Sequence, residues 1–591
     1  MTDFHFSPRP NRASEIAWRI WGDEAFREAR SADKPVLLAI SAVWCHWCHV
    51  MDETSYSDPA VIAGINERYI PIRVDNDERP DVNRRYNMGG WPTTAFLTPD
   101  GEILNGATYI PPDAMRRYVA EVADIWRDKR SELEPRLREL KAHEADAHAQ
   151  KPGDLDWSIV DAIGALIRGQ YDPEYGGFGR EPKFPQPRLL RFLIDEYRRT
   201  QSGDVAAMLH KTLAAMASGG MYDPIEGGFF RYSTTRAWGI PHFEKMLEDN
   251  AELLAIYSEA HRTFPSAGYD RIVRDVMRWM DTVLWRDDVN AFSGSQDADE
   301  HYYTLDAAGR AAHGAPFVDR RVYAGWNALA ASAYLVAANA LGEHGPHDRA
   351  VAVMRSLGSR MWDGTALAHF DRGDGPELRG LLADYSAAIG TILDEYETAE
   401  HPNALAAAAD MSGAMRRTLE DPVAGGFWDA PERDAPGRLA MREKPIEDGA
   451  AMAEALLRLA VLTGDDGWRE SALRALRGFV GEYRQWGQFA AAFGSAVARA
   501  LGEPRLAVVV GPTEDPAARA LWQIVLASDD PNGARQWLVP GRDSERIAAR
   551  GYPADRVAAY VCVGVVCSAP IAAPAELGSE LARVRRRSGP D

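Results

Sequence analysis

Cysteine is scarce in this chain, and the sequence has no long apolar run. Only four cysteines occur among 591 residues, in two close pairs, Cys45 with Cys48 and Cys562 with Cys567. This number excludes a disulfide-stapled scaffold. No run of about 18 apolar residues is present, and residues 1–10 show no basic patch followed by an apolar stretch. We therefore expect neither a membrane span nor a secretory signal, and we expect the protein in the cytoplasm.

Positive charge is also in deficit. The 67 Lys and Arg residues against 87 Asp and Glu residues leave a formal net charge of −20. Such a surface repels polyphosphates and anionic lipid headgroups, so we expect no nucleic acid and no membrane as partners. With 46% hydrophobic and 26% charged residues the chain has a globular composition, and its length exceeds what one core supports. The sequence predicts a multidomain protein.

The chain divides into four regions by its hydrophobic patterns. Residues 1–130 alternate helical periods with short apolar runs that are typical of buried strands, which predicts an α/β domain. Charged residues dominate the next stretch, and we predict a helical extension and linker over 131–153. Residues 154–502 show strong helical periods with almost no strand-like segments, and 503–591 return to strands around a helix. The last region is predicted to be a small α/β domain.

The helical region contains a repeated turn signal. Twelve helical periods occur, and after every second one an Asp precedes a turn that leads to a Phe, usually through glycines. These Asp residues are Asp172, Asp223, Asp287, Asp363 and Asp421. Six helical hairpins favour an all-α (α/α)6 toroid, with inner and outer helices alternating and the turn loops around a central funnel. An open stack of helix pairs is the alternative.

The first cysteine pair has the context of a redox dithiol. Cys45-His46-Trp47-Cys48 follows a predicted buried strand and opens a helix. A thiol at a helix N-terminus faces unsatisfied N–H groups and the positive end of the dipole, which stabilise the thiolate. Cys45 is therefore predicted to attack, and Cys48, one turn on, to resolve the mixed disulfide. A protonated His46 would favour the thiolate further.

Three other interpretations of this motif stay open. With the next residue, His49, the motif reads C-x-x-C-H, the attachment sequence of c-type haem. The two cysteine pairs together could supply a zinc site, although the spacing of the second pair is loose. The cysteines could also be buried without chemistry. Trp91-Pro92 weighs against this last reading, because a cis proline at a strand start would set the Trp91 backbone beside the dithiol.

Several motifs together resemble a known family. They are Trp44–Met51, Val74–Asp81, Gly89–Pro92, Phe96–Gly101, Lys183–Pro185, Pro241–Asn250, Gln296–Asp299, Trp326-Asn327 and Asp384-Tyr385. This set resembles the spermatogenesis-associated thioredoxin-domain protein family and its bacterial relatives, and the resemblance spans roughly residues 1–570. The resemblance implies a thioredoxin-like N-terminal domain and a toroid similar to N-acylglucosamine 2-epimerases and six-hairpin glycosidases. One departure is that Asp448-Gly449-Ala450 continues into apolar helix, where the family usually carries Pro-Ser-Gly-Asn.

A second candidate site is predicted at the rim of the toroid. One acid and one base can flank a glycosidic or hemiacetal carbon, and aromatic rings can stack on a pyranose. The candidate catalytic residues are Cys45, Cys48 and Pro92 at the dithiol, and His242, Glu244, Asp297 and Asp299 at the rim. The candidate substrate-binding residues are Trp44, His46, Trp47, Trp91, Trp238, Asp249, Trp326, Asn327, Asp384 and Tyr385. Asp and Asn at helix starts are also common N-caps, which is the structural alternative.

The sequence thus predicts a thiol–disulfide oxidoreductase module fused to a toroid that binds a sugar, a polyol or a polypeptide. Its expected partners are a thiol or disulfide compound and a carbohydrate, and neither a cofactor nor a metal is expected. A carbohydrate epimerase or glycoside hydrolase in the toroid is one alternative, and a non-catalytic interaction scaffold is another. Cys562 and Cys567 are expected to be two buried thiols. The alternatives are a disulfide across a bend, or a pair that accepts electrons from Cys45 and Cys48 if the C-terminal region folds back onto the first domain.

Overall fold

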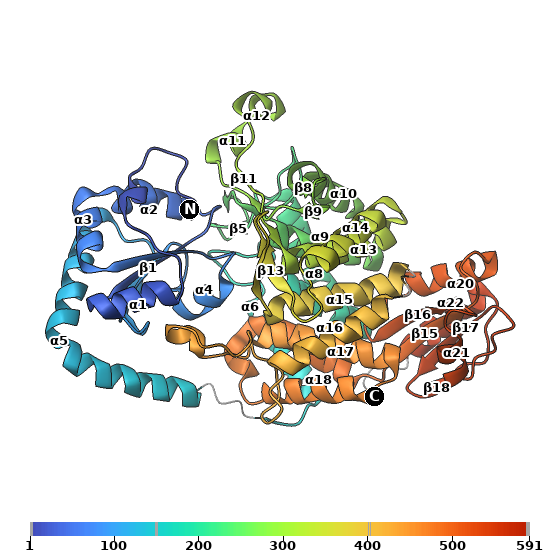
Figure 1. Cartoon of the computed structure of the whole chain (residues 1–591). Coiled ribbons are helices and arrows are strands. Elements are labelled where there is room, and N and C mark those ends of the chain that lie inside the picture. Colours follow the sequence, from blue (N-terminus) through green and yellow to red (C-terminus); the bar gives the residue numbers. More distant parts are fainter. Residues whose placement is uncertain (1–3, 148–151, 400, 402, 587–591) are drawn as a thin grey trace. The chain divides into compact units, whose positions relative to one another are not determined.

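The chain forms two compact units. The computed structural model describes residues 4–147, 152–399, 401 and 403–586 (Figure 1). The first unit combines Met1–Ala149 with Ser295–Asp319 and Asp429–Glu443, and the remaining segments form the second. The first unit thus includes two segments that the sequence analysis assigned to the toroid. Residues 148–151 of the predicted linker lie outside the described residues, as do 1–3 and 587–591 of the terminal regions.

A four-stranded sheet in the order β2-β1-β3-β4 forms the centre of the first unit. Strand β1 (Val36–Ser41) is parallel to β2 (Ile70–Asp75) and antiparallel to β3 (Thr93–Leu97), which pairs with β4 (Ile103–Ala107). All residues of β1 are buried, as expected for a central strand.

Helices cover both faces of this sheet. They are α1 (Asp23–Ala32), α2 (His46–Glu53), α3 (Pro59–Arg68), α4 (Pro80–Tyr86) and α5 (Pro112–Ala147). Side chains of α2, α3 and α5 form one core with Leu37 and Ala39, whereas α1 and α4 pack with Val36, Leu38 and Ile40 on the other face. This is a thioredoxin-like fold, and α5 continues through the charged stretch as predicted.

The segment Asp429–Glu443 completes the second of these cores. Leu439 packs into the cluster formed with α1 and α4, and Asp429 pairs with Arg85 at 2.8 Å. Arg79 and Arg433 both pair with the buried Asp81. Burial by itself raises the pKa of Asp81, but the guanidinium groups of Arg79 and Arg433 outweigh this effect and lower the pKa to about 2. Hydrophobic contact and buried ion pairs therefore hold this distant segment on the thioredoxin-like domain.

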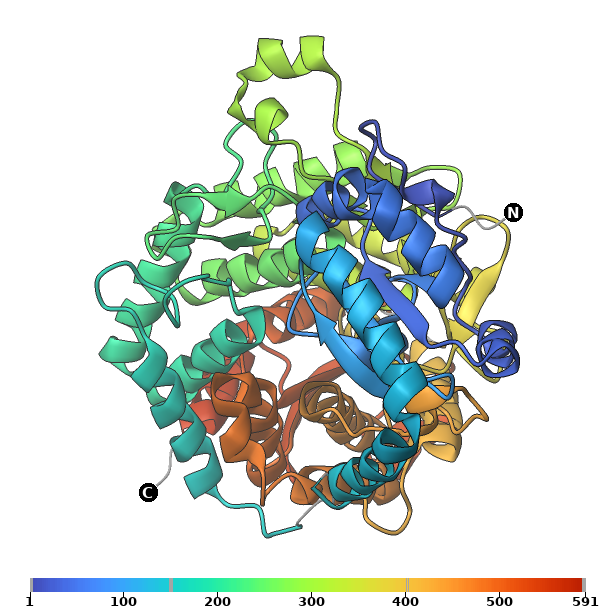
Figure 2. The ribbon, with the colours of Figure 1, turned by 90° about the vertical axis from the view of Figure 1, so that its left-hand side faces the viewer.

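The second unit contains a closed ring of inner helices. In the described part of the chain these are α7 (Pro187–Thr200), α9 (Leu247–Thr263), α13 (Ala324–Leu341), α15 (Leu382–Ala399), α17 (Ile446–Thr463) and α19 (Ala491–Leu501). Each contacts the next in this order, and α19 contacts α7, so the ring closes. The chain colours follow the ring from green through yellow to orange in Figure 2.

Outer helices pair with the inner ones. They are α6 (Trp157–Gln170) with α19, α8 (Gly203–Ser218) with α7, α10 (Asp270–Trp279) with α9, α14 (Gly345–Arg360) with α13, α16 (Ala404–Leu419) with α15 and α18 (Asp466–Gly478) with α17. The predicted (α/α)6 toroid is confirmed, and an open stack is excluded by the contact between α19 and α7.

Short elements occupy the connections between the hairpins. In the second unit they are β5 (Tyr232–Ser233), β6 (Pro241–His242), β7 (Lys245–Met246), β8 (Trp285–Arg286), β9 (Ala291–Phe292), β12 (Val322–Tyr323), β13 (Ala368–Asp371) and β14 (Pro376–Arg379). The segment Ser295–Asp319 of the first unit contains β10 (Ser295–Gln296), α11 (Glu300–Thr304), α12 (Ala307–His313) and β11 (Val318–Asp319).

Buried lysines hold the glycine-rich loops of the ring. The Lys245 ammonium donates to Asp223 at 2.7 Å and to the carbonyl of Gly227 at 2.9 Å. The same arrangement recurs for Lys183 with Asp172 and Gly176, and for Lys444 with Asp421 and Gly425. Three of the five Asp residues of the turn signal therefore anchor a loop through a charge pair with a lysine.

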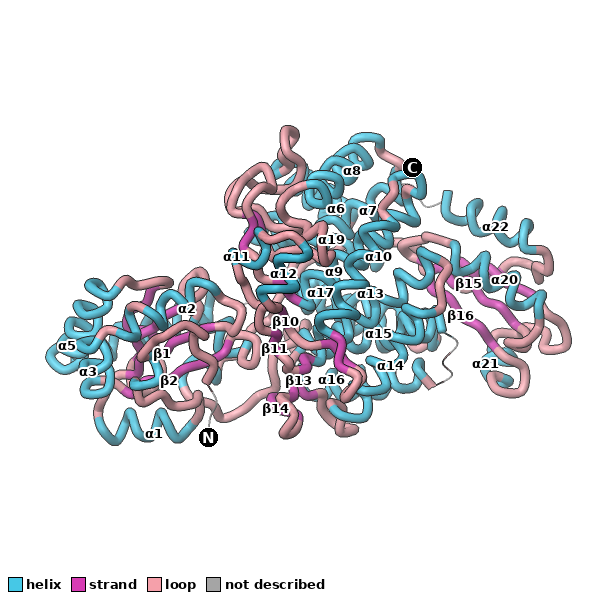
Figure 3. The backbone as a smooth tube through the Cα atoms, turned by 90° about the horizontal axis from the view of Figure 1, so that it is seen from above, coloured by secondary structure: helices cyan, strands magenta, loops and turns pink. Residues whose placement is uncertain are grey.

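The C-terminal region repeats the strand arrangement of the thioredoxin-like domain. It contains β15 (Arg505–Val510), α20 (Pro516–Ala527), β16 (Gly533–Leu538), α21 (Ser544–Ala549), β17 (Ala558–Val563), β18 (Val566–Cys567) and α22 (Pro574–Arg586). The sheet order is β16-β15-β17-β18, with β15 parallel to β16 and antiparallel to β17. Helices α20 and α22 lie beside these strands and pack on one face of the sheet (Figure 3). The predicted small α/β domain is confirmed.

Replacing Lys245 by Met should destabilise the second unit. The substitution leaves the Asp223 carboxylate buried without its cation, which typically costs about 3–5 kcal/mol. Denaturant unfolding should show the loss, whereas Lys211→Ala on the exposed face of α8 should change the free energy of unfolding by about 0.5 kcal/mol or less. Equal unfolding midpoints for Lys245→Met and the native chain would contradict a stabilising role for this ion pair.

Candidate functional site

The dithiol lies at the start of α2, directly after β1. Cys45 and Cys48 form a disulfide, and Cys45 is the N-cap residue of the helix. The Cys45 Sγ accepts a hydrogen bond from the backbone N–H of Cys48, with a donor–acceptor distance of 3.2 Å. The two cysteines are 4% and 3% exposed. After reduction, the same N–H would donate to a thiolate at Cys45.

Aromatic residues surround the pair. The Trp44 indole donates to Asp77 at 2.6 Å, and its ring lies 5.8 Å from that of Trp91. The Trp91–Pro92 peptide bond is cis and directly precedes β3. Trp47 is 45% exposed and contacts the ring of Tyr109. The predicted lining residues of the dithiol lie in the same domain as Pro92; they are Trp44, His46, Trp47 and Trp91. Trp47 offers an accessible surface.

The segment Ser295–Asp319 brings carboxylates to the histidines of the cysteine motif. His46 Nδ1 lies 2.9 Å from Glu300 Oε1, and His49 Nδ1 lies 4.0 Å from Asp297 Oδ2. A second contact comes from Phe317, which stacks on His5 at 4.9 Å between ring centroids. The sequence analysis assigned Asp297 to the toroid rim, whereas the structure places it in the first unit beside the dithiol helix.

Burial sets the charge of His49. Desolvation, with additional repulsion from His5, Arg73 and His46, lowers the pKa of His49 to about 4. The imidazole is therefore neutral near pH 7, and its low pKa makes it a weak base. A neutral imidazole and the buried Asp297 carboxylate thus lie beside the dithiol helix.

Several predicted residues of the toroid make structural contacts. The side chain of Asn327 accepts from the Phe292 N–H at 2.7 Å and donates to the carbonyls of Phe292 and Tyr323. Asn250 makes the same three contacts one hairpin earlier, with Phe229 and Met246. These amides hold the Phe of the turn signal against the inner helix. The Asn327 side chain therefore makes its hydrogen bonds to backbone groups of the ring.

Four further predicted residues serve the scaffold in similar ways. Asp384 accepts from the Gly325 N–H at 3.0 Å and from His369 at 2.9 Å, and the Tyr385 hydroxyl accepts from the Leu367 N–H. Trp238 is buried against the Lys183 ammonium. In the first unit Asp299 caps α11 by accepting from the Tyr302 N–H at 2.9 Å. The N-cap alternative therefore describes Asp299.

His242 and Glu244 form a separate polar pair in the second unit. His242 stacks on Tyr232, which stacks in turn on Phe184, with centroid distances of 4.7 and 4.6 Å. His242 Nδ1 lies 3.6 Å from Glu244 Oε1. Glu244 is 3% exposed, and its Oε2 has no hydrogen-bond partner among the described residues. An aromatic strip thus ends at a buried, incompletely satisfied carboxylate.

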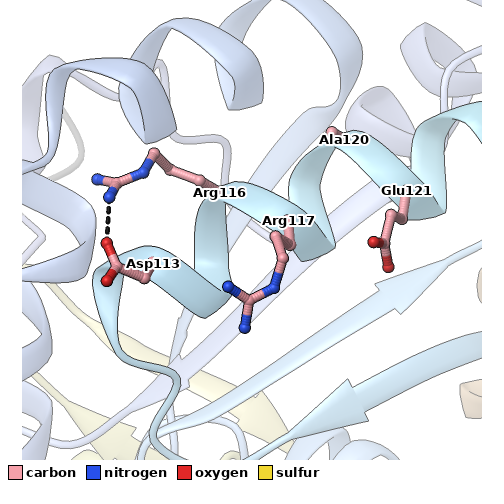
Figure 4. A pocket seen from close by; sticks show the side chains of 5 residues that line it. All are labelled: Asp113, Arg116, Arg117, Ala120 and Glu121. Atoms are coloured by element: carbon pink, nitrogen blue, oxygen red, sulfur yellow. Dashed lines mark hydrogen bonds and ion pairs between the residues drawn. The ribbon is translucent and has the colours of Figure 1, made fainter.

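The last two predicted toroid residues lie on inner helices. Asp249 is half-buried in the first turn of α9, and the half-buried Trp326 contacts the Tyr323 ring at 4.4 Å at the start of α13. A surface depression runs elsewhere, along α5, where Asp113, Arg116, Arg117, Ala120 and Glu121 line it (Figure 4). Arg116 pairs with Asp113 there. Its lining includes none of the predicted site residues.

The second cysteine pair corrects an expectation. Cys562 and Cys567 form a disulfide, and Cys567 is exposed, so the prediction of two buried thiols is wrong. The reason is that the hairpin of β17 and β18 places the two residues directly opposite each other. Within the described ranges, no group of three or more His, Cys, Asp or Glu side chains is arranged to hold a metal ion. No described helix has the length and apolarity needed to cross a membrane.

Residue types alone did not reveal three neighbours of the dithiol. Asp77 lies in the Val74–Asp81 motif, whose only signal was family resemblance. His49 was considered only within the haem motif and the family motif Trp44–Met51, and Glu300 directly follows the Gln296–Asp299 motif. A histidine adjacent to a resolving cysteine was the signal that could have identified His49.

Comparisons with known proteins agree with this organisation. Residues 9–143 match a family model, Thioredox_DsbH, described as a protein of unknown function, DUF255. Human Spermatogenesis-associated protein 20 is 25% identical over 95% of this chain and 89% of its own length. Thiol:disulfide interchange protein DsbD 1 of Pseudomonas aeruginosa is 39% identical over 14% of each chain. Cellobiose 2-epimerase of Bacillus thermoamylovorans superposes with a TM-score of 0.45 at 11% identity, covering 56% of this chain and 87% of that one.

The fold and the cysteine motif define a thioredoxin-like domain joined to a helical toroid. These comparisons agree with the resemblance to the spermatogenesis-associated thioredoxin-domain proteins that the motifs indicated.

Replacing His49 by Gln should weaken the acid sensitivity of the protein. Since the folded state lowers the His49 pKa from 6.5 to about 4, the unfolded chain binds the proton first as the pH falls. Stability should therefore drop between pH 6.5 and 4, by on the order of 3 kcal/mol from this residue. Denaturant unfolding across this range should show a shallower pH dependence for His49→Gln.

The exposed His313 provides the control for this measurement. His313→Gln should keep the pH dependence of the native chain. If His49→Gln also keeps it, His49 does not titrate as its burial requires.

Proposed function

We propose that the first unit is a thiol–disulfide oxidoreductase that acts through Cys45 and Cys48. The observation that carries this proposal is the hydrogen bond from the Cys48 N–H to the Cys45 sulfur at the start of α2. A donor at this place favours the thiolate of Cys45 over the thiol, and the thiolate is the nucleophile in disulfide exchange. The similarity to a thiol:disulfide interchange protein over part of the domain supports the same reaction.

The reaction needs two steps. The Cys45 thiolate attacks a substrate disulfide, so a mixed disulfide forms and one substrate sulfur leaves as a thiolate. The Cys48 thiol then loses its proton and attacks Cys45, which forms the Cys45–Cys48 disulfide and releases the second substrate thiol. The buried Asp297 carboxylate, which lies 4.0 Å from His49 Nδ1 beside the motif, is our candidate for receiving the Cys48 proton. Glu300 fixes the His46 ring beside the motif.

The exposed surface around the motif indicates the kind of substrate. Trp47 and Tyr109 present aromatic surface next to buried sulfurs. We propose that a partner protein or small molecule with a thiol or disulfide docks there, in the cytoplasm as the sequence predicts. The direction of net electron flow depends on the redox poise of that compartment.

We propose that the toroid binds a sugar, a polyol or a polypeptide. The specific observation that favours a carbohydrate is the Phe184–Tyr232–His242 stack, which ends at the buried Glu244. Aromatic faces suit pyranose rings, and an incompletely hydrogen-bonded carboxylate can accept from a sugar hydroxyl. The same pair supports the second candidate function, an epimerase or hydrolase that uses His242 and Glu244 for proton transfer.

The cysteine roles can be tested with oxidised glutathione. After reduction of the full chain, Cys48→Ser should retain one glutathione on residue 45, because the resolving thiol is gone. Cys45→Ser should react at least about tenfold more slowly, because the remaining thiol has no comparable donor. Peptide mass spectrometry that maps each adduct provides the measurement.

Ser41→Ala at the end of β1 provides a control that leaves both sulfurs in place and should oxidise like the native chain. Equal adduct formation in the native, Cys45→Ser and Cys48→Ser chains would defeat the proposed assignment.

The carbohydrate proposal predicts that His242→Ala and Glu244→Gln weaken sugar binding. Loss of a stacked ring or of a buried acceptor typically costs about 1–3 kcal/mol, so affinity should fall roughly tenfold or more. Calorimetric titration of the full chain with reducing sugars, polyols and unsaturated oligosaccharides tests this, with turnover followed in the same mixtures. His344→Ala, at an exposed position, is the control. If none of these compounds binds, or if the variants bind as the native chain does, this site is not a carbohydrate site.

A further inference from the structure

The C-terminal domain carries a cysteine pair at a different place from the first domain. Both sheets have the same strand order and the same parallel and antiparallel pairings. In the first domain the cysteines follow the central strand, but residues 511–516, which follow β15, contain no cysteine. The pair lies instead on the hairpin of β17 and β18. The C-terminal domain therefore has a thioredoxin-like strand arrangement with its disulfide at the sheet edge.

This disulfide is accessible at one of its two sulfurs. Cys562 is buried on β17, whereas Cys567 is exposed on β18, the edge strand of the sheet. The hairpin tip between them is open, since Val565 is 100% and Val566 70% exposed. Cys567 is therefore the residue of the pair at which we expect an attacking thiolate to approach.

The position of the disulfide gives it little value as a staple. Cys562 and Cys567 are separated by five positions in sequence, and their strands already pair through a two-residue loop. The stabilisation that a disulfide gives by restricting the unfolded chain grows with the length of the loop that it closes. This bond closes a very short loop, so a structural role explains it poorly.

A hydroxyl group contacts both sulfurs. The Tyr552 oxygen lies 3.3 Å from the Cys562 Sγ and 3.6 Å from the Cys567 Sγ, and its ring stacks on Tyr560 at 4.3 Å. Burial raises the pKa of Tyr552, so the hydroxyl keeps its proton. It can therefore donate a hydrogen bond to a thiolate that forms when the disulfide breaks, and a stabilised leaving thiolate leaves faster.

We propose that Cys562–Cys567 is a second thiol–disulfide exchange site, which accepts two electrons from a dithiol. One thiolate of the dithiol attacks the exposed Cys567 sulfur, the disulfide bond breaks, and Cys562 leaves as a thiolate that Tyr552 hydrogen-bonds and water then protonates. The second thiol of the reductant, after losing its proton, attacks the mixed disulfide and releases the Cys567 thiolate, which is protonated in turn. The dithiol ends as a disulfide and both cysteines as thiols. This site does not depend on the proposed activity of Cys45 and Cys48.

The test uses the full chain with Cys45→Ser and Cys48→Ser, so that only the second pair can react. The protein is incubated with dithiothreitol at several ratios of its reduced and oxidised forms, then alkylated, and the thiols are mapped by peptide mass spectrometry while circular dichroism follows the fold. We expect reversible reduction of both cysteines with an unchanged spectrum. Mapping the native chain site by site gives the same readout if the double variant does not fold.

Tyr552→Phe separates an exchange site from a merely accessible bond. This variant should slow reduction about fivefold or more. Tyr560→Phe should react at the native rate, because it removes a neighbouring hydroxyl that makes no hydrogen bond in the described part of the chain. Resistance to dithiothreitol until the chain unfolds would overturn the proposal. An unchanged rate in Tyr552→Phe would overturn it as well.

Discussion

One backbone amide, that of Cys48, links the fold of the first domain to its chemistry. Cys45 leaves the buried strand β1 in an extended conformation, and both its carbonyl and its sulfur accept the Cys48 N–H in the first turn of α2. The interaction that starts the helix is therefore also the one that would stabilise a thiolate. In the proposed reaction the donor would already be in place before a substrate binds, because the helix positions it.

Charge pairs inside each unit show which polar side chains of the sequence motifs hold loops and which lie beside a candidate site. In the first unit, the carboxylates of Asp297 and Glu300 lie beside His49 and His46, so a segment far along the chain shapes the surroundings of the dithiol. In the second, three of the repeated Asp residues, Asp172, Asp223 and Asp421, are paired with lysines and hold loops of the ring. His242 and Glu244 differ from these pairs because Glu244 keeps an unused oxygen. The molecule thus separates polar groups that hold loops from those that remain available.

Much of this organisation followed from local patterns. Apolar runs predicted the strands of both α/β domains, and helical periods predicted the twelve helices of the ring, because these signals depend on neighbouring residues. The recruitment of Ser295–Asp319 and Asp429–Glu443 to the first unit was not predictable, since it depends on contacts such as Arg433 with Asp81 that no local pattern contains. For the same reason Asn327 and Tyr385 were read as binding residues, although their partners are backbone groups of the ring. The pairing of Cys562 with Cys567 required the register of a hairpin.

The most direct test of the account compares the two sulfurs of the reduced native dithiol. A limiting amount of an alkylating agent is added at neutral pH, and the site of the first modification is mapped by mass spectrometry. If the amide of Cys48 holds a thiolate at the start of α2, Cys45 should be modified well before Cys48. Modification of Cys48 first, or equally slow modification of both, would contradict the claim that the helix activates Cys45.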